Sequence, residues 1–86
     1  MTRQTRIYDT LTQAFTPEML EVIDDSARHA GHAGASPEGE THYNIVIKAA
    51  AFDGLSRVAM QRAIMQALEA EFQSGLHALS IKASTN

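Results

Sequence analysis

The segment that decides the fold is Gly75-Leu76-His77-Ala78-Leu79-Ser80-Ile81-Lys82, close to the end of the 86-residue chain. Gly75 is suited to stop a preceding helix, because glycine adopts positive φ angles at little steric cost. Leu79 and Ile81 then alternate with small or polar residues, which is typical of a strand with one buried face. His77 is two residues before Leu79 and so falls on the same face of the strand as Leu79 and Ile81. It is either a half-buried structural residue or a ligand at the edge of a sheet.

A long helix is predicted upstream of Gly75. Ser56 is a suitable N-cap, because its hydroxyl can accept a hydrogen bond from a backbone N–H of the first turn. The sequence Phe52-Asp53-Gly54 before it is typical of a turn. We therefore expect a helix near Ser56–Ser74. Its expected apolar positions are Val58, Ile64, Met65, Leu68 and Phe72.

A first helix is predicted over Thr2–Phe15, where apolar residues recur with helical spacing. Pro17 ends this helix, because proline disfavours helical geometry in the residue before it. A short strand is expected next, near Met19–Ile23, with Leu20 and Val22 on one face.

Residues 28–40 are predicted to form a flexible loop. They contain three glycines, a proline and two histidines. With little apolar surface to bury, they should be the least ordered internal part of the chain. A second strand is expected over Thr41–Ala49, where Tyr43, Ile45 and Ile47 alternate with polar residues. His42 falls on the polar side and is expected to be a structural or partly exposed strand residue.

The predicted order of elements is α-β-β-α-β within a single domain, residues 1–86. The first two strands are joined by a loop and should be antiparallel. The helix between the second and third strands makes a crossover, so those two should be parallel. The fold class is therefore α+β, a two-layer sandwich of a three-stranded mixed sheet with both helices on one face. The expected core is Leu20, Val22, Ile45, Ile47, Leu68, Phe72, Leu79 and Ile81.

The composition restricts the functions open to the chain. Its net charge is −3 with neutral histidines, whereas a dedicated nucleic-acid binder normally carries a basic surface. No apolar run approaches the roughly 20 residues that span a bilayer, and no signal peptide is visible. We therefore expect a cytoplasmic protein that does not bind a membrane. No sequence motif indicates an enzyme. The chain has no cysteine, so a soft metal would need histidine, a carboxylate or a partner's ligand.

Five segments in the same order and spacing resemble the BolA family. Residues 20–26, the histidine-containing loop and residues 39–43 (Gly-Glu-Thr-His-Tyr) are similar to its first hairpin. Residues 52–56 (Phe-Asp-Gly-Leu-Ser) are similar to its turn into the long helix. Residues 68–72 (Leu-Glu-Ala-Glu-Phe) and 76–81 (Leu-His-Ala-Leu-Ser-Ile) resemble its most specific signature. The resemblance covers nearly the whole chain and implies a fold related to the type II KH domain.

The resemblance also implies a function. BolA proteins pair with monothiol glutaredoxins of the Cys-Gly-Phe-Ser type and share a [2Fe–2S] cluster, with cysteine from the glutaredoxin and its bound glutathione. This links them to iron–sulfur cluster assembly or trafficking, or to iron regulation. The family's histidine in the last strand corresponds to His77, which implies a metal ligand. A second ligand comes from the first loop and corresponds here to His29, with His32 as the other candidate. The isolated chain, a monomer or weak homodimer, is expected to hold no cluster tightly.

Two other functions are kept as alternatives. Some bacterial BolA proteins are described as transcriptional regulators, which implies a KH-like, nucleic-acid-binding function. That function is disfavoured here, because no Gly-x-x-Gly loop stands between Asp53 and Ala63. In addition, Met60-Gln61-Arg62 replaces a more basic run on the long helix. The other alternative is a module that binds zinc or another metal by itself through the same three histidines.

Overall fold

The computed structural model describes residues 2–25 and 42–85, and the predicted loop over residues 28–40 lies outside them. The elements follow the predicted order, except that the second helix is divided and a short 3₁₀ helix precedes it. The bounds are α1 Arg3–Phe15, β1 Met19–Asp24, β2 His42–Lys48, η2 Ala50–Phe52, α2 Arg57–Ala67, α3 Glu69–Gln73 and β3 Ala78–Ser84.

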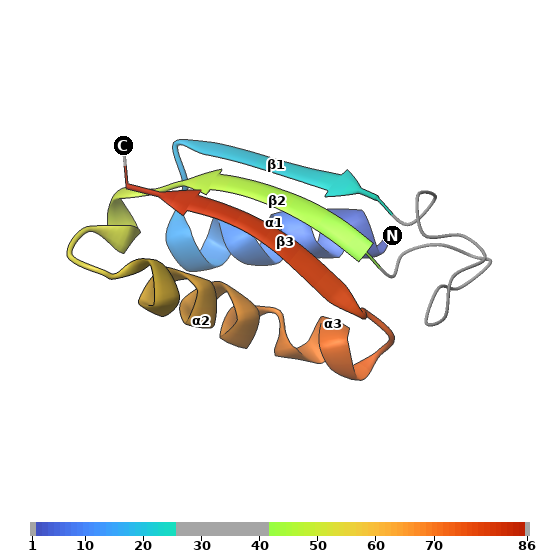
Figure 1. Ribbon diagram of the computed structural model, residues 1–86. Coiled ribbons are helices and arrows are strands. Elements are labelled where there is room, and N and C mark those ends of the chain that lie inside the picture. The colour runs from blue at the N-terminus through green and yellow to red at the C-terminus, as the bar shows by residue number, and fades with distance from the viewer. Residues whose placement is uncertain (1, 26–41, 86) are drawn as a thin grey trace.

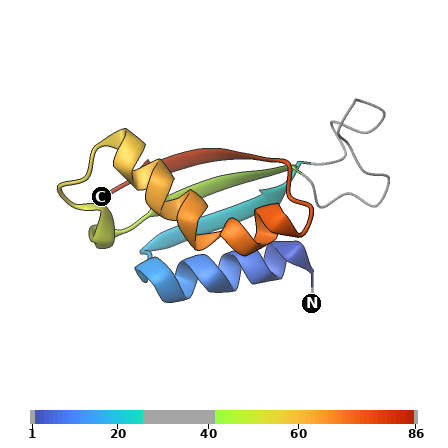
Figure 2. The same ribbon diagram turned by 90° about the horizontal axis from the view of Figure 1, so that it is seen from below.

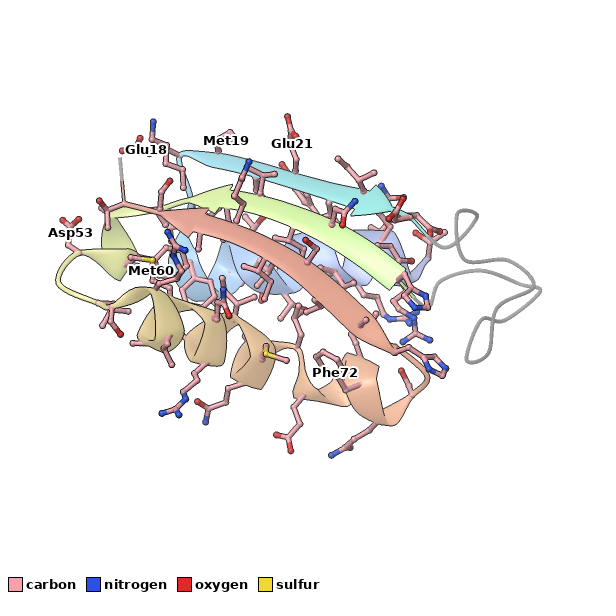
Figure 3. All side chains as sticks on the ribbon, in the orientation of Figure 1. Glu18, Met19, Glu21, Asp53, Met60 and Phe72 are labelled. Carbon is pink, nitrogen blue, oxygen red and sulfur yellow. The ribbon has the colours of Figure 1, made fainter. Side chains whose placement is uncertain are left out.

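The three strands form one sheet in the order β1-β2-β3. β1 pairs antiparallel with β2, with Val22 opposite Ile45, and β2 pairs parallel with β3, with Ile45 opposite Ile81. Figure 1 shows α1, α2 and α3 on one face of this sheet, and Figure 2 shows the same layer from the side of the helices. Met19 and Glu21 of β1 point to the opposite face (Figure 3). The predicted two-layer α+β sandwich with a mixed sheet is therefore confirmed.

Local sequence signals set the ends of the helices. The Thr2 hydroxyl caps α1 by accepting the Thr5 N–H at 3.2 Å, and the predicted N-cap Ser56 accepts the Ala59 N–H at 3.1 Å. At the other end of α1, the residue before the proline adopts the left-handed conformation, with φ of 47° at Thr16. Within residues 2–25 and 42–85, no helix is both long and apolar enough to cross a membrane.

The core lies between the sheet and the helices. Tyr43, Ile45 and Ile47 point inward along β2 and are at most 2% exposed, as the two-residue period of a strand requires. The predicted core residues that are buried are Val22, Ile45, Ile47 and Leu68. Those that pack against the core while staying partly exposed are Leu20, Phe72, Leu79 and Ile81. The buried apolar residues outside the predicted set are Ile7, Leu11, Tyr43, Ala49, Phe52, Ile64 and Leu76.

The prediction of one continuous helix over Ser56–Ser74 is wrong, because the helix is interrupted at Leu68. This residue has φ of −101° and ψ of 14°, and its N–H bonds to the carbonyl oxygens of Ile64 and Met65. Such local tightening of the hydrogen bonding ends α2 before α3 begins. The sequence has neither proline nor glycine at this point, so the interruption carries no local signal.

Three apolar residues lie in surroundings that differ from the prediction. Phe52, assigned to a turn, belongs to η2 and is fully buried, with its ring centroid 4.9 Å from that of Phe15. Val58 and Met65, assigned to the apolar side of the helix, are 57% and 45% exposed. Since α2 contacts β3 and α1, only the side of the helix that faces them is covered.

A buried ion-pair network joins the first turns of α1 to α3. Arg3 is 9% exposed, and its Nη1 donates to Glu71 Oε1 at 2.9 Å and to Ser74 Oγ at 2.8 Å. Arg6 Nε and Nη2 donate to the two carboxylate oxygens of Glu71, each at 3.0 Å. These hydrogen bonds from Arg6, opposed by burial and reinforced by both guanidinium charges, hold the pKa of Glu71 below its ordinary value. The network fixes α3 against the start of α1.

Leu68→Ala should destabilise the protein by about 2–5 kcal/mol, because truncating a buried leucine loses apolar contact and leaves a cavity. Leu68 is 1% exposed. Urea denaturation followed by far-UV circular dichroism measures the loss. Met65→Ala, three residues away at an exposed position, is the matched control and should change the stability by less than about 1 kcal/mol. Equal losses for both variants would contradict the described packing.

Glu71→Gln should lower the free energy of unfolding at neutral pH by about 3–5 kcal/mol, because it leaves buried guanidinium charge without its counter-ion. The lowered pKa of Glu71 means that its stabilisation is present above the unfolded-state pKa. It is lost as the pH falls below about 4.5 toward the folded-state pKa. The variant should therefore lose less stability than the wild type between about pH 5 and pH 3.

Urea denaturation across that pH range measures both effects. Glu69→Gln, at an exposed position of the same short helix, is the control and should follow the wild type. An acid dependence of the Glu71→Gln variant as steep as that of the wild type would show that other carboxylates cause it.

Candidate functional site

His77 is positioned by the turn that ends α3. Gly75 has φ of 129°, a conformation that favours glycine, and the Leu76 N–H donates to the Glu71 carbonyl oxygen at 2.9 Å. This bond spans the helix end as in a Schellman motif, which confirms the predicted role of Gly75. Leu76 then enters the core at 4% exposure. His77 itself is exposed, directly before the first residue of β3, so the interpretation as a half-buried core residue is wrong.

His42 lies beside His77. It is the first residue of β2 and pairs with Ala78 of β3, the residue that follows His77. The centroids of the two imidazole rings are 6.0 Å apart, and the ring planes differ by 9°. On its other side the His42 carbonyl oxygen accepts the N–H of Asp25, the residue directly after β1, at 2.8 Å. These two imidazoles at one end of the sheet form what we call the histidine pair.

The sequence pattern describes His42 correctly as a partly exposed strand residue. It does not indicate that His42 lies beside His77. A signal was present, because parallel strands begin at the same end of a sheet and the two predicted strands start near residues 41 and 77. Side-chain alternation obscured this signal. His77 is two residues before Leu79, so in a regular strand its side chain would point inward with that of Leu79. His77 escapes that alternation because it precedes the strand.

An open depression of about 220 Å³ lies next to His42. Asp25, Asn44 and Ser80 are among the residues that line it, and the last two are opposite each other in the β2–β3 register. A metal-ligating imidazole usually donates its second ring N–H to a carboxylate, a carbonyl or water. The depression thus contains the kind of polar group that orients such a ring.

The histidine pair has a spacing that suits one transition-metal ion. Metal–nitrogen bonds of about 2.0–2.1 Å place the centroids of two imidazoles on the same ion about 5–6 Å apart. Imidazole is a ligand for iron, zinc, copper and nickel. Among the residues that the structure describes, no three histidine or carboxylate side chains are grouped to hold a metal ion. The pair supplies two ligands, and a four-coordinate ion takes two more from another source.

The predicted loop ligands His29 and His32 lie outside the described residues. Their distance from the histidine pair is therefore not defined by the structure, and their role as ligands stays a prediction.

A second surface feature lies toward the other end of β3. Arg57 and Gln61 of α2, with Ile81, Lys82 and Ala83 of β3, line a groove between the helix and the edge strand. Two cations therefore face this groove in a chain whose net charge is −3. Lys82 is five residues along the chain from His77, about 16 Å in an extended strand, so the groove and the pair are separate features.

Comparisons with known proteins agree with this architecture. The UV-induced protein uvi31 of Schizosaccharomyces pombe is 40% identical over 87 residues, which cover 98% of this chain and 85% of that protein. SufE-like protein 1 of Arabidopsis thaliana, a chloroplastic/mitochondrial protein, is 47% identical over 87 residues. The match covers 96% of this chain but only 24% of the plant protein.

The solved BolA domain of SufE1 from Arabidopsis thaliana matches this fold with a TM-score of 0.89 at 46% identity. The similarity covers 99% of this chain and 93% of that domain. The fold is thus that of a BolA domain, a small α+β sandwich. A family model described as BolA-like protein matches residues 11–86, and the chain belongs to the BolA family, as the sequence resemblance predicted.

Gly75→Ala should destabilise the protein by about 1–3 kcal/mol, because φ of 129° is strained for any residue with a Cβ. The added Cβ would also lie 3.2 Å from Arg3 Nη2, against the ion-pair network. Gly54→Ala is the matched control, since Gly54 also has a positive φ but no atom within 4 Å of the added Cβ. Thermal unfolding of both variants makes the comparison. A loss for Gly54→Ala that exceeds the loss for Gly75→Ala would contradict the described turn.

Proposed function

We propose that this protein pairs with a monothiol glutaredoxin of the Cys-Gly-Phe-Ser type and shares or receives a [2Fe–2S] cluster through histidine ligands. In this role it is a partner protein in cluster assembly, trafficking or iron regulation, and not an enzyme. The observation that carries the proposal is the exposed imidazole of His77 at the end of the sheet, in a BolA-family chain that has no cysteine.

The ligand chemistry of such a cluster supports the proposal. A [2Fe–2S] cluster takes four ligands, normally cysteine thiolates, and histidine can replace some of them. This chain has no cysteine, so the thiolates come from the glutaredoxin and its glutathione. Replacing thiolate by the neutral imidazole raises the reduction potential of a cluster. The shared cluster should therefore differ in spectrum and potential from the one held by the glutaredoxin alone.

His77 is the principal ligand in this proposal, because the α3 turn and β3 fix its backbone while its ring is exposed. A site on such fixed elements holds a ligand more accurately than a free loop does. The loop histidines His29 and His32 are candidates for the second ligand on the family resemblance alone.

Nucleic-acid binding is the second candidate function, and the groove lined by Arg57 and Lys82 is the observation that favours it. Cationic side chains neutralise phosphates and supply most non-specific affinity. Two cations are a small number for that purpose, and the net charge of −3 opposes long-range attraction of a polyanion. Cluster sharing is therefore the better-supported function.

Mixing this protein with a cluster-loaded monothiol glutaredoxin should change the visible absorption and circular dichroism of the cluster. His77→Ala should abolish that change, because it removes the principal imidazole ligand. It should leave the folding stability within about 1 kcal/mol of the wild type, since the ring is exposed. Gln73→Ala, an exposed position at the end of α3, is the control and should preserve the spectral change.

Two results would overturn the proposal. One is an unchanged cluster spectrum with the wild-type protein. The other is a His77→Ala variant that alters the spectrum as the wild type does.

A further inference from the structure

We propose that His42 and His77 bind one transition-metal ion together, so that His42 is the second ligand supplied by this chain. The chemical class of ligand is an imidazole-binding metal ion, either a free divalent ion such as Zn²⁺ or an iron of a shared cluster. Only the second case rests on the function proposed above. The inference assigns a ligand role to a strand residue whose sequence pattern indicates none.

The geometry of the histidine pair is the first support. Its ring centroids are 6.0 Å apart, close to the separation of about 5–6 Å for two imidazoles on one ion. The rings are stacked, with planes 9° apart, so both side chains have to rotate before a nitrogen of each ring faces a common ion. The same separation also falls within the range of a simple aromatic contact, and direct metal titration distinguishes the two.

The backbone that carries the pair is the second support. His42 is held from both neighbouring strands, by the parallel register with β3 and by the Asp25 N–H. His77 is held from both sides in sequence, by the buried Leu76 and by β3. The backbone of both histidines is already ordered before a metal ion binds, which lowers the entropic cost of binding.

The surroundings of His42 are the third support. Its depression has polar lining residues, and Asp25 is one of them. A carboxylate near a ligating imidazole can accept its second N–H and fix the tautomer, and it adds negative charge close to a cation. His42 is also only partly exposed, so its ring has fewer orientations to lose than a ring on a free loop.

Titration of the full-length chain with Zn²⁺ tests the pair without any partner. Isothermal titration calorimetry and the ¹⁵N shifts of the histidine rings should show one ion per chain bound by His42 and His77. His42→Ala and His77→Ala should each weaken binding by about tenfold or more, since even the loss of an outer-shell partner costs tenfold to a hundredfold. The double variant should lose little more than either single one, because one remaining imidazole no longer chelates.

Gln73→Ala, at an exposed position at the end of α3, is the matched control and should keep the wild-type affinity. His42→Asn retains a polar side chain in the strand. It tests the loss of the imidazole even if His42→Ala fails to fold. The inference is wrong if the wild type binds no Zn²⁺, or if both His42 variants bind it like the wild type. It is also wrong if Gln73→Ala loses as much affinity as His42→Ala.

A second arm with the cluster-loaded glutaredoxin separates this inference from the proposed function. His42→Ala should reduce the spectral change of the cluster, as His77→Ala does. If the wild type changes the spectrum and His42→Ala changes it equally, the role of His42 toward the cluster fails while the proposed function stands. If the wild type leaves the spectrum unchanged but binds Zn²⁺ through the pair, the proposed function fails and the metal site stands.

Discussion

The Arg3 guanidinium connects the beginning of the chain to the turn on which the candidate site depends. It donates to the carboxylate and carbonyl oxygens of Glu71 and to the hydroxyl and carbonyl oxygens of Ser74. Those acceptors belong to the end of α3, and Gly75 follows them directly, where an added Cβ would lie 3.2 Å from Arg3 Nη2. Because a buried arginine is stable only with its partners in place, α1, the end of α3 and the start of β3 are fixed relative to one another.

The parallel pairing of β2 and β3 brings His42 and His77 together. The turn after α3 places His77 at the end of the sheet where β2 begins. The β2–β3 register places Ala78 opposite His42. Neither histidine has to enter the core, because the stability of this region comes from Leu76 and from the Arg3–Glu71 ion pair. His77 is therefore exposed and His42 partly exposed, and neither ring is enclosed in the core.

Much of this fold follows from local rules of sequence, and the exceptions have physical causes. The N-cap at Ser56, the stop before Pro17 and the role of Gly75 are properties of one or two residues, so the sequence predicts them. The burial of Phe52 depends on packing with a distant segment, since its ring lies against that of Phe15. The interruption at Leu68 occurs where the sequence has neither proline nor glycine, so no local residue announces it. The nearness of His42 and His77 depends on strand register, which side-chain alternation alone does not reveal. His77 is a candidate from sequence, whereas its pairing with His42 requires the structure.

Pulsed electron paramagnetic resonance of the reduced, cluster-bound complex tests histidine ligation most directly. The sample would combine this protein, labelled with ¹⁵N-histidine, with an unlabelled monothiol glutaredoxin. Direct ligation predicts strong ¹⁵N couplings from this chain, one lost in His77→Ala and one in His42→Ala. A complex that forms with no strong ¹⁵N coupling from this chain would show that its histidines do not bind the cluster, and would contradict the central claim.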